Sequence, residues 1–128
     1  MEPQADHPRI LVVEDDPDLR NLWVAVLQDM GCVVTAVSEG AEACRAIETF
    51  RPRLMLLDLV MPGAELDGFD VLLRTEQSGV PVIVVSALGR ELRETLGRRV
   101  AAVLPKPLDV YELMGEVKRQ LSPSGSSA

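Results

Sequence analysis

Short apolar runs alternate along the chain with longer amphipathic segments. The five apolar runs are rich in Val, Ile and Leu with little polar alternation, which is typical of strands buried on both faces of a parallel sheet. They cover Ile10–Val13, Cys32–Val37, Leu54–Leu57, Val80–Val85 and Val100–Leu104. This alternation predicts βαβ units and an α/β fold, in which helices cover both faces of a parallel sheet.

Five helices are predicted from apolar residues that recur at helical spacing. Their stripes are Leu19, Leu22, Val26, Leu27 and Met30; Ala43, Cys44, Ile47 and Phe50; Phe69, Leu72 and Leu73; Leu88, Leu92, Thr95 and Leu96; and Val110, Leu113, Met114, Val117 and Leu121. Pro17 or Asp18 is expected to begin the first helix, and Asp109 to cap the last. Gly31 and Gly97 are expected to end the first and fourth helices.

The length and composition suit one compact domain. The chain has 128 residues, and we expect the domain over residues 9–121, with flexible ends at 1–8 and 122–128. No apolar run approaches the roughly 18–20 residues that cross a bilayer, and the polar start does not resemble a secretory signal. Cys32 and Cys44 fit apolar patterns, so we interpret them as small core residues of a cytoplasmic protein.

Charged and hydroxyl side chains gather where the predicted strands end. The formal net charge of −7 argues against a broad basic surface for nucleic acid. The side chains at the strand ends are Glu14, Asp15 and Asp16 after the first, Asp58 after the third, Ser86 after the fourth and Lys106 after the fifth. Ligands of open α/β sheets bind beyond the carboxyl ends of the strands, so we expect these side chains to form one site.

The chemistry that this set favours is transfer of a phosphoryl group to a carboxylate. Clustered carboxylates repel one another unless a cation lies among them. Mg²⁺, with Mn²⁺ as the alternative, prefers oxygen ligands and needs only one or two protein carboxylates. An aspartate can act as the nucleophile, and the ammonium of Lys106 is suited to neutralise phosphoryl oxygens. The Ser86 hydroxyl is suited to hydrogen-bond one of them.

Five motifs, taken in order, resemble the receiver domains of two-component response regulators. They are Ile10–Pro17, Leu57–Pro62, Asp67–Gly68, Val82–Ala87 and Leu104–Leu108. The resemblance spans about residues 9–121 and implies a flavodoxin-like, doubly wound (βα)₅ fold with a five-stranded parallel sheet in the order 2-1-3-4-5. It also implies a phospho-accepting signalling switch of a two-component or phosphorelay pathway. Such a domain assists its own phosphorylation and dephosphorylation and is not an enzyme acting on a separate substrate.

The resemblance implies a role for each matching residue around the metal. Asp58 would be the phosphoacceptor. Mg²⁺ would be bound by Asp15 and Asp58, by Glu14 directly or through water, and by the backbone carbonyl of Val60. Asp16 lies outside the family's essential set, and we interpret it as a loop acid.

The resemblance also implies how the switch is read. Lys106 would pair with Asp58 and the phosphoryl group, Ser86 would move toward that group, and the Lys106–Pro107 peptide bond would be cis. The face that family members usually present to partners would here include Leu88, Leu92, Leu96, Val100 and Ala101, some of them as core residues.

The sequence departs from the family pattern at several positions. Val103 stands where many receivers have an aromatic residue that swings inward, so that relay is in doubt here. Val60 and Leu88 offer no hydrogen bonds to an attacking water, from which we infer a long-lived phosphoryl group.

The loop of residues 62–68 is two residues longer than the commonest form, and its Glu65 is interpreted as an exposed acid. Trp23 is predicted to lie partly in the core, with a docking role as the alternative.

The expected partners are a histidine kinase or histidine phosphotransfer protein and a downstream protein target or output domain. No direct nucleic-acid or membrane partner is expected, and the sequence leaves undecided whether a homodimer forms on phosphorylation.

The alternative functions are a receiver excised from a hybrid sensor kinase or a longer regulator, and a receiver fold used only for docking. A small Mg²⁺-dependent phosphatase is disfavoured, because such enzymes place a second acid where Val60 stands.

Overall fold

The structure, a computed structural model, describes residues 7–59 and 68–122. Strands and helices alternate along it. In order they are β1 (Arg9–Val13), α1 (Pro17–Asp29), β2 (Val33–Val37), α2 (Gly40–Thr49), β3 (Leu54–Asp58), α3 (Gly68–Thr75), η2 (Glu76–Ser78), β4 (Val82–Ser86), α4 (Gly89–Leu96), η3 (Gly97–Arg99), β5 (Ala102–Pro105) and α5 (Val110–Leu121). The ends predicted to be flexible are residues 1–8 and 122–128. Of these, residues 1–6 and 123–128 lie outside the described residues.

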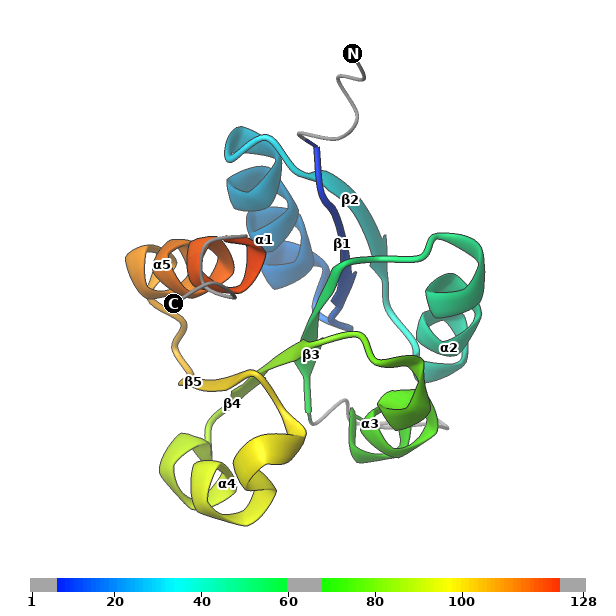
Figure 1. Cartoon of the computed structure of the whole chain (residues 1–128). Coiled ribbons are helices and arrows are strands. Elements are labelled where there is room, and N and C mark those ends of the chain that lie inside the picture. Colours follow the sequence, from blue (N-terminus) through cyan, green and yellow to red (C-terminus); the bar gives the residue numbers. More distant parts are fainter. Residues whose placement is uncertain (1–6, 60–67, 123–128) are drawn as a thin grey trace.

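The five strands form one parallel sheet in the order β2-β1-β3-β4-β5, as predicted (Figure 1). Its register determines which strand ends meet. Asp58 at the end of β3 lies opposite Val85, and Ser86 at the end of β4 lies opposite Pro105. The carboxyl ends of β3, β4 and β5 therefore reach the same edge of the sheet.

Helices cover both faces of this sheet, with α1 and α5 on one face and α2, α3 and α4 on the other (Figure 1). Successive strand residues point to opposite faces, so Ile10 and Val12 pack with α1 and α5, whereas Leu11 and Val13 pack with α2, α3 and α4. The strands β1, β3 and β4 are buried along almost their whole length. Their continuous apolar sequences follow from burial on two faces.

Several predicted core positions were wrong. Leu22 on α1 is 47% exposed, and Phe69 and Leu73 on α3 are 41% and 60% exposed. On α1 the buried side chains are Trp23, which was placed beside the predicted stripe, and Leu27, which belongs to it. Trp23 is only 2% exposed, which confirms the core interpretation and leaves its ring out of reach of a docking partner.

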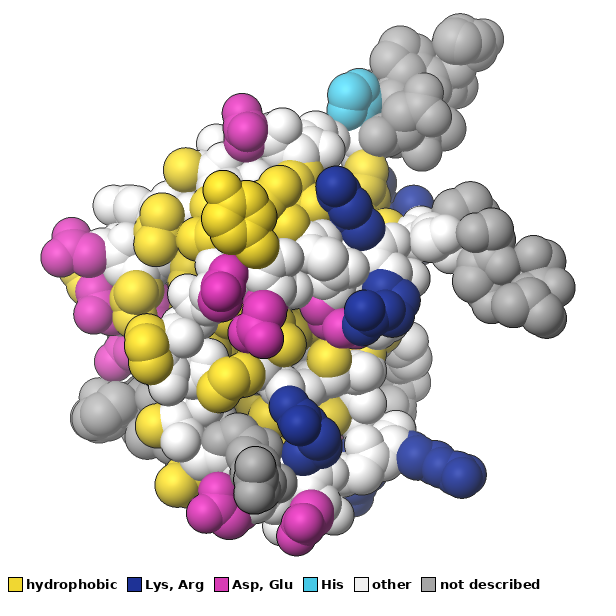
Figure 2. All heavy atoms as spheres, turned by 90° about the vertical axis from the view of Figure 1, so that its left-hand side faces the viewer, with side chains coloured by type: hydrophobic (Ala, Val, Ile, Leu, Met, Phe, Trp, Pro, Cys, Tyr) yellow, Lys and Arg dark blue, Asp and Glu magenta, His cyan; other side chains and the backbone are white. Residues whose placement is uncertain are grey.

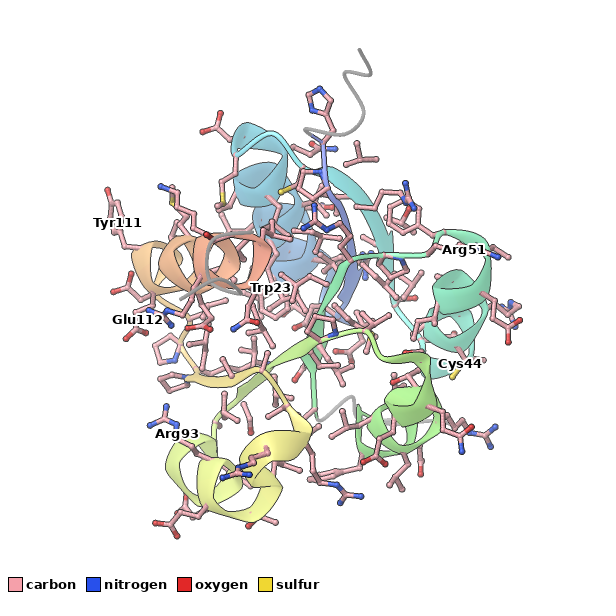
Figure 3. All side chains as sticks on the ribbon, viewed as in Figure 1. Trp23, Cys44, Arg51, Arg93, Tyr111 and Glu112 are labelled. Atoms are coloured by element: carbon pink, nitrogen blue, oxygen red, sulfur yellow. The ribbon has the colours of Figure 1, made fainter. Side chains whose placement is uncertain are left out.

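The predicted strand starts and cysteine positions also need correction. The fourth strand begins at Val82 rather than Val80, because Pro81 has no N–H to donate to a neighbouring strand. The fifth strand begins at Ala102 rather than Val100. Both cysteines are free; Cys32 is buried as predicted, but Cys44 on α2 is only half-buried (Figure 3).

Two aspartates cap the helices that flank the site. The Asp16 carboxylate accepts hydrogen bonds from the backbone N–H groups of Asp18 and Leu19, and α1 begins at Pro17. An acid followed by proline is a typical helix start, so Asp16 is more than the loop acid that we inferred. Asp109 caps α5 as predicted, because its carboxylate accepts hydrogen bonds from the backbone N–H groups of Tyr111 and Glu112.

A close backbone approach explains the glycine that begins α3. A side-chain carbon at Gly68 would overlap the backbone of Leu59, the residue directly after Asp58. Only glycine allows two chain segments to approach so closely. Gly68 therefore lets α3 pack against the end of the strand that carries Asp58.

Within residues 7–59 and 68–122, no helix combines the length and the apolar character that crossing a membrane requires.

Candidate functional site

The structure brings the predicted acidic residues together at the carboxyl edge of the sheet. Glu14, Asp15 and Asp58 each offer a carboxylate oxygen, and these atoms lie within 4.8 Å of one another. They line a cleft of about 450 Å³ whose walls are formed by Glu14, Asp15, Asp16, Leu19, Asp58, Ser86, Ala87, Leu88 and Lys106. Side chains from four separate segments therefore meet in one cleft.

Burial makes this cluster electrostatically unusual. Glu14 is 1% exposed and Asp58 2% exposed, whereas Asp15 is more open to solvent. Burial, assisted by the neighbouring Asp58 carboxylate, raises the pKa of Glu14 to about 8, although the Asp16 N–H and Lys106 act in the opposite direction. Without a further cation, the folded protein resists placing the full negative charge of this cluster in the cleft.

Lys106 supplies the positive charge that faces the acids. Its Nζ lies 3.2 Å from Oδ2 of Asp58 and 3.9 Å from Oε1 of Glu14. The backbone N–H of Lys106 donates to the Ser86 carbonyl at 3.0 Å, which extends the pairing of β4 and β5 beyond the strands. The Lys106–Pro107 peptide bond is cis, as predicted.

The hydrogen bonding of the Glu14 carboxylate indicates that the carboxylates of this cleft suit a cation. Oε2 of Glu14 accepts a hydrogen bond from the Asp16 N–H at 3.0 Å. Oε1 of Glu14 is buried and, among the described residues, has no hydrogen-bond partner. A buried carboxylate oxygen that accepts no hydrogen bond and faces an ammonium only at 3.9 Å is incompletely satisfied, and a hard cation with oxygen ligands would satisfy it. Glu14, Asp15 and Asp58 thus fit Mg²⁺.

The Ser86 hydroxyl lies at the cleft wall, at the end of β4. Ser86 is 3% exposed, and its Oγ accepts a hydrogen bond from the Leu88 N–H at 3.0 Å. Leu88 is 54% exposed and lines the cleft next to Ser86. The other two loop residues singled out from the sequence, Val60 and Glu65, lie outside the described residues.

The predicted readout face divides into core and surface. Leu92 and Leu96 are buried, whereas Val100 and Ala101 are half-buried beside a second hollow of about 320 Å³ between α4, β5 and α5. Figure 2 views the side of the molecule that carries α4 and α5, where acidic, basic and apolar side chains are interspersed. The face is therefore mixed in character rather than uniformly acidic.

Val103, where the family resemblance implies an aromatic ring in many receivers, is buried at 4% exposure. Its carbonyl accepts a hydrogen bond from the Arg93 guanidinium on α4 at 2.9 Å. Figure 3 shows Arg93 on α4 on the same side of the domain as Tyr111 and Glu112 on α5. Tyr111 projects from the surface and is 83% exposed, so it does not replace the missing ring in the core.

Two roles around the first loop were not predicted from the sequence: the helix cap formed by Asp16 and the contact made by Arg20 on α1. Asp16 lines the cleft and caps α1, which the sequence Asp16-Pro17 signals through its preference for helix starts. Arg20 on α1 donates to the backbone carbonyls of Glu14 and Asp15. No motif signals this contact, because an arginine in a helical pattern is usually a solvated side chain.

Comparison with known proteins agrees with this geometry. The family model described as "Response regulator receiver domain" matches residues 10–118. The DNA-binding response regulator MtrA of Mycolicibacterium smegmatis is 37% identical over 117 residues, which cover 88% of this chain and 50% of MtrA. The chain thus spans about half the length of that relative.

Two solved structures show the same fold. The receiver domain of NtrX from Brucella abortus has a TM-score of 0.81 and 31% identity, covering 90% of this chain and 99% of the other. The receiver domain of the sensor histidine kinase PA1611 from Pseudomonas aeruginosa has a TM-score of 0.78 and 28% identity, covering 89% and 97%. The latter structure holds a magnesium ion coordinated in its active-site cleft. With the family model matching most of its length, the chain belongs to the response regulator receiver domain family of two-component signalling.

Proposed function

We propose that this domain accepts a phosphoryl group on Asp58 and uses it as a signalling switch. The observation that carries the proposal is the pairing of Asp58 with Lys106 inside a cleft that also contains Glu14 and Asp15. A buried aspartate beside an ammonium and two further carboxylates has a nucleophile, a fixed cation and oxygen ligands in one place.

The donor would be the phosphohistidine of a histidine kinase or phosphotransfer protein. An oxygen of Asp58 forms the new P–O bond as the P–N bond breaks, and the electron pair of that bond stays on the imidazole nitrogen. Lys106 holds a positive charge against the oxygens of the transferring group. With acetyl phosphate the same oxygen attacks phosphorus, and acetate leaves with the electron pair of the broken P–O bond.

Glu14, Asp15 and Asp58 would hold Mg²⁺, or Mn²⁺ in its place, together with the backbone carbonyl of Val60 that the family resemblance implies. When bound, the ion would neutralise negative charge on the transferring phosphoryl oxygens. The magnesium in the PA1611 receiver supports this assignment, as does the buried Glu14 oxygen that has no hydrogen bond in the described part of the chain.

The Ser86 hydroxyl would transmit the change. Its oxygen accepts a hydrogen bond from the Leu88 N–H at the start of α4. If the hydroxyl turned toward a phosphoryl oxygen, that hydrogen bond would break. The domain would then shift its population toward a conformation with a different α4 surface. A downstream protein or output domain, or a second phosphorylated copy, would bind that surface. The two free cysteines support a reducing cytoplasm as the setting.

The test is intact mass after incubation with acetyl phosphate, in Mg²⁺ and in EDTA. We expect one phosphoryl group on the wild-type chain in Mg²⁺, none in EDTA and none on Asp58→Asn. No gain of mass, together with no binding of beryllofluoride to the folded protein, would overturn the proposal and favour a docking module that is never phosphorylated.

A further inference from the structure

A side chain on α1 holds the loop that presents two of the proposed magnesium ligands. The Nη1 of Arg20 donates to the Glu14 carbonyl at 2.9 Å and lies 3.4 Å from the Asp15 carbonyl. Both peptide groups lie between β1 and α1, outside the regular pairing of strands and helices. The half-buried guanidinium therefore spans two consecutive carbonyls directly behind the acidic cluster.

The rest of this loop is attached at other points. The Glu14 N–H donates to the Val37 carbonyl at 3.1 Å, and the Asp16 N–H donates to the Glu14 carboxylate. The Asp16 carboxylate caps α1. The first two of these contacts hold the backbone N–H groups of Glu14 and Asp16. Arg20 holds the backbone carbonyl groups of Glu14 and Asp15. The orientation of a peptide plane determines where the attached side chains project.

We infer that Arg20 is a positioning residue for metal binding: it holds the backbone of Glu14 and Asp15 so that their carboxylates converge with Asp58. The inference rests on the proposed function, since it assumes that these acids bind Mg²⁺. Groups that orient metal ligands without touching the metal usually change its affinity by about 10–100-fold when removed.

Charge alone predicts the opposite effect. Arg20 places a positive charge beside a site for a divalent cation, so removing it would strengthen cation binding if Coulomb repulsion were its main influence. Positioning predicts weaker binding. The sign of the change in the Mg²⁺ dissociation constant therefore separates the two explanations, and a role in stability alone predicts no change.

The chain offers a matched control at the other end of the sheet. The Nε of Arg9 donates to the carbonyls of Phe50 at 2.8 Å and Arg51 at 3.3 Å, beyond the end of α2. Like Arg20, it holds two consecutive carbonyls, but these belong to a segment remote from the acidic cleft. Arg9→Ala should therefore reproduce any loss of stability without changing the binding of Mg²⁺.

The experiment is calorimetric titration of Mg²⁺ into the full chain, with thermal melts of each protein. We expect Arg20→Ala to raise the dissociation constant about ten-fold and Arg9→Ala to leave it unchanged. Arg20→Lys keeps the charge, but its side chain is shorter and does not carry the ammonium to the position of Nη1, so it should raise the constant by about three-fold or more. If Arg20→Ala does not fold, Arg20→Lys decides.

An Arg20 variant that folds and binds Mg²⁺ as tightly as wild type, or more tightly, would overturn the inference. The wild-type titration distinguishes this result from failure of the proposed function. If wild type binds Mg²⁺ and the Arg20 variants match it, only the role of Arg20 is lost. If wild type itself does not bind Mg²⁺, the assignment of the metal site is overturned, and the role of Arg20 with it.

Discussion

The ammonium of Lys106 lies 3.2 Å from a carboxylate oxygen of Asp58, and both side chains belong to a cleft at the carboxyl edge of the sheet. Lys106 follows β5 and Asp58 ends β3, so the pair is brought together across β4. The contact places the proposed nucleophile beside the ammonium that would offset the negative charge on the oxygens of the transferring phosphoryl group.

Replacing this cation should slow phosphorylation while leaving the fold intact. We expect Lys106→Met to lower the rate of phosphorylation by acetyl phosphate at saturating Mg²⁺ by about 100-fold or more, because a fixed charge at the developing anion is lost. The rate is measured by intact mass over time. Lys118→Met removes an exposed lysine on α5 and should match wild type; equal rates for both variants would contradict the role of Lys106.

The phosphoryl group should persist on the isolated domain. The cleft wall next to Ser86 is formed by Leu88, whose apolar side chain cannot orient an attacking water. Leu88→Gln supplies a hydrogen-bonding group there and should speed loss of the phosphoryl group about ten-fold. The mass of the phosphorylated protein is followed after the donor is removed.

Leu73→Gln serves as the control for this measurement, since it changes an exposed leucine on α3 that does not line the cleft. Rapid loss from wild type, or equal decay of wild type and Leu88→Gln, would argue against the inference from Leu88.

The raised pKa of Glu14 makes the stability of the metal-free protein depend on pH. The pKa is about 8 in the folded protein, against an ordinary value of 4.5. Between these values the folded state binds more protons than the unfolded chain, so the free energy of unfolding should fall as the pH rises from about 4.5 to about 8.

Thermal melts in EDTA across this pH range measure that effect. Glu14→Gln should flatten the decline, because the amide does not ionise, and Mg²⁺ should restore stability to wild type near the upper end of the range. A decline that is as steep in Glu14→Gln as in wild type would assign it to other groups.

Two helix caps permit a direct comparison of structural and chemical roles. Asp16 and Asp109 each accept from two backbone N–H groups at a helix start, and replacing either with alanine should cost about 1 kcal/mol of stability. Only Asp16 lines the cleft. Because we assign it the role of a cap, both variants should still be phosphorylated in Mg²⁺. Loss of phosphorylation in a folded Asp16→Ala alone would show that Asp16 also acts in the site.

The sequence predicted the sheet and the site better than it predicted the helix faces. Strands buried on two faces have continuous apolar runs, and the register of a parallel sheet brings Asp58, Ser86 and Lys106 to one edge. The exposed Leu22 and Leu73 were assigned to the core because helical spacing defines a stripe but not which neighbouring stripe faces the sheet.

The loop contacts behind the acids were beyond the sequence for another reason. Arg20 holds carbonyls of Glu14 and Asp15, and peptide carbonyls carry no residue identity for a pattern to match. That Oε1 of Glu14 accepts no hydrogen bond from the described residues depends on how the loop and its neighbours are placed. Side-chain contacts to the backbone of this kind emerge only when the chain is placed in three dimensions.

The central claim is that the phosphoryl group resides on Asp58 rather than on another acid of the cleft. Hydride reduction of the phosphorylated protein converts an aspartyl phosphate to homoserine, and peptide mass mapping locates the converted residue. We predict homoserine at position 58 alone, and none when phosphorylation is carried out in EDTA. Conversion at Asp15 or Asp16, or a phosphorylated protein that yields no homoserine, would contradict the account.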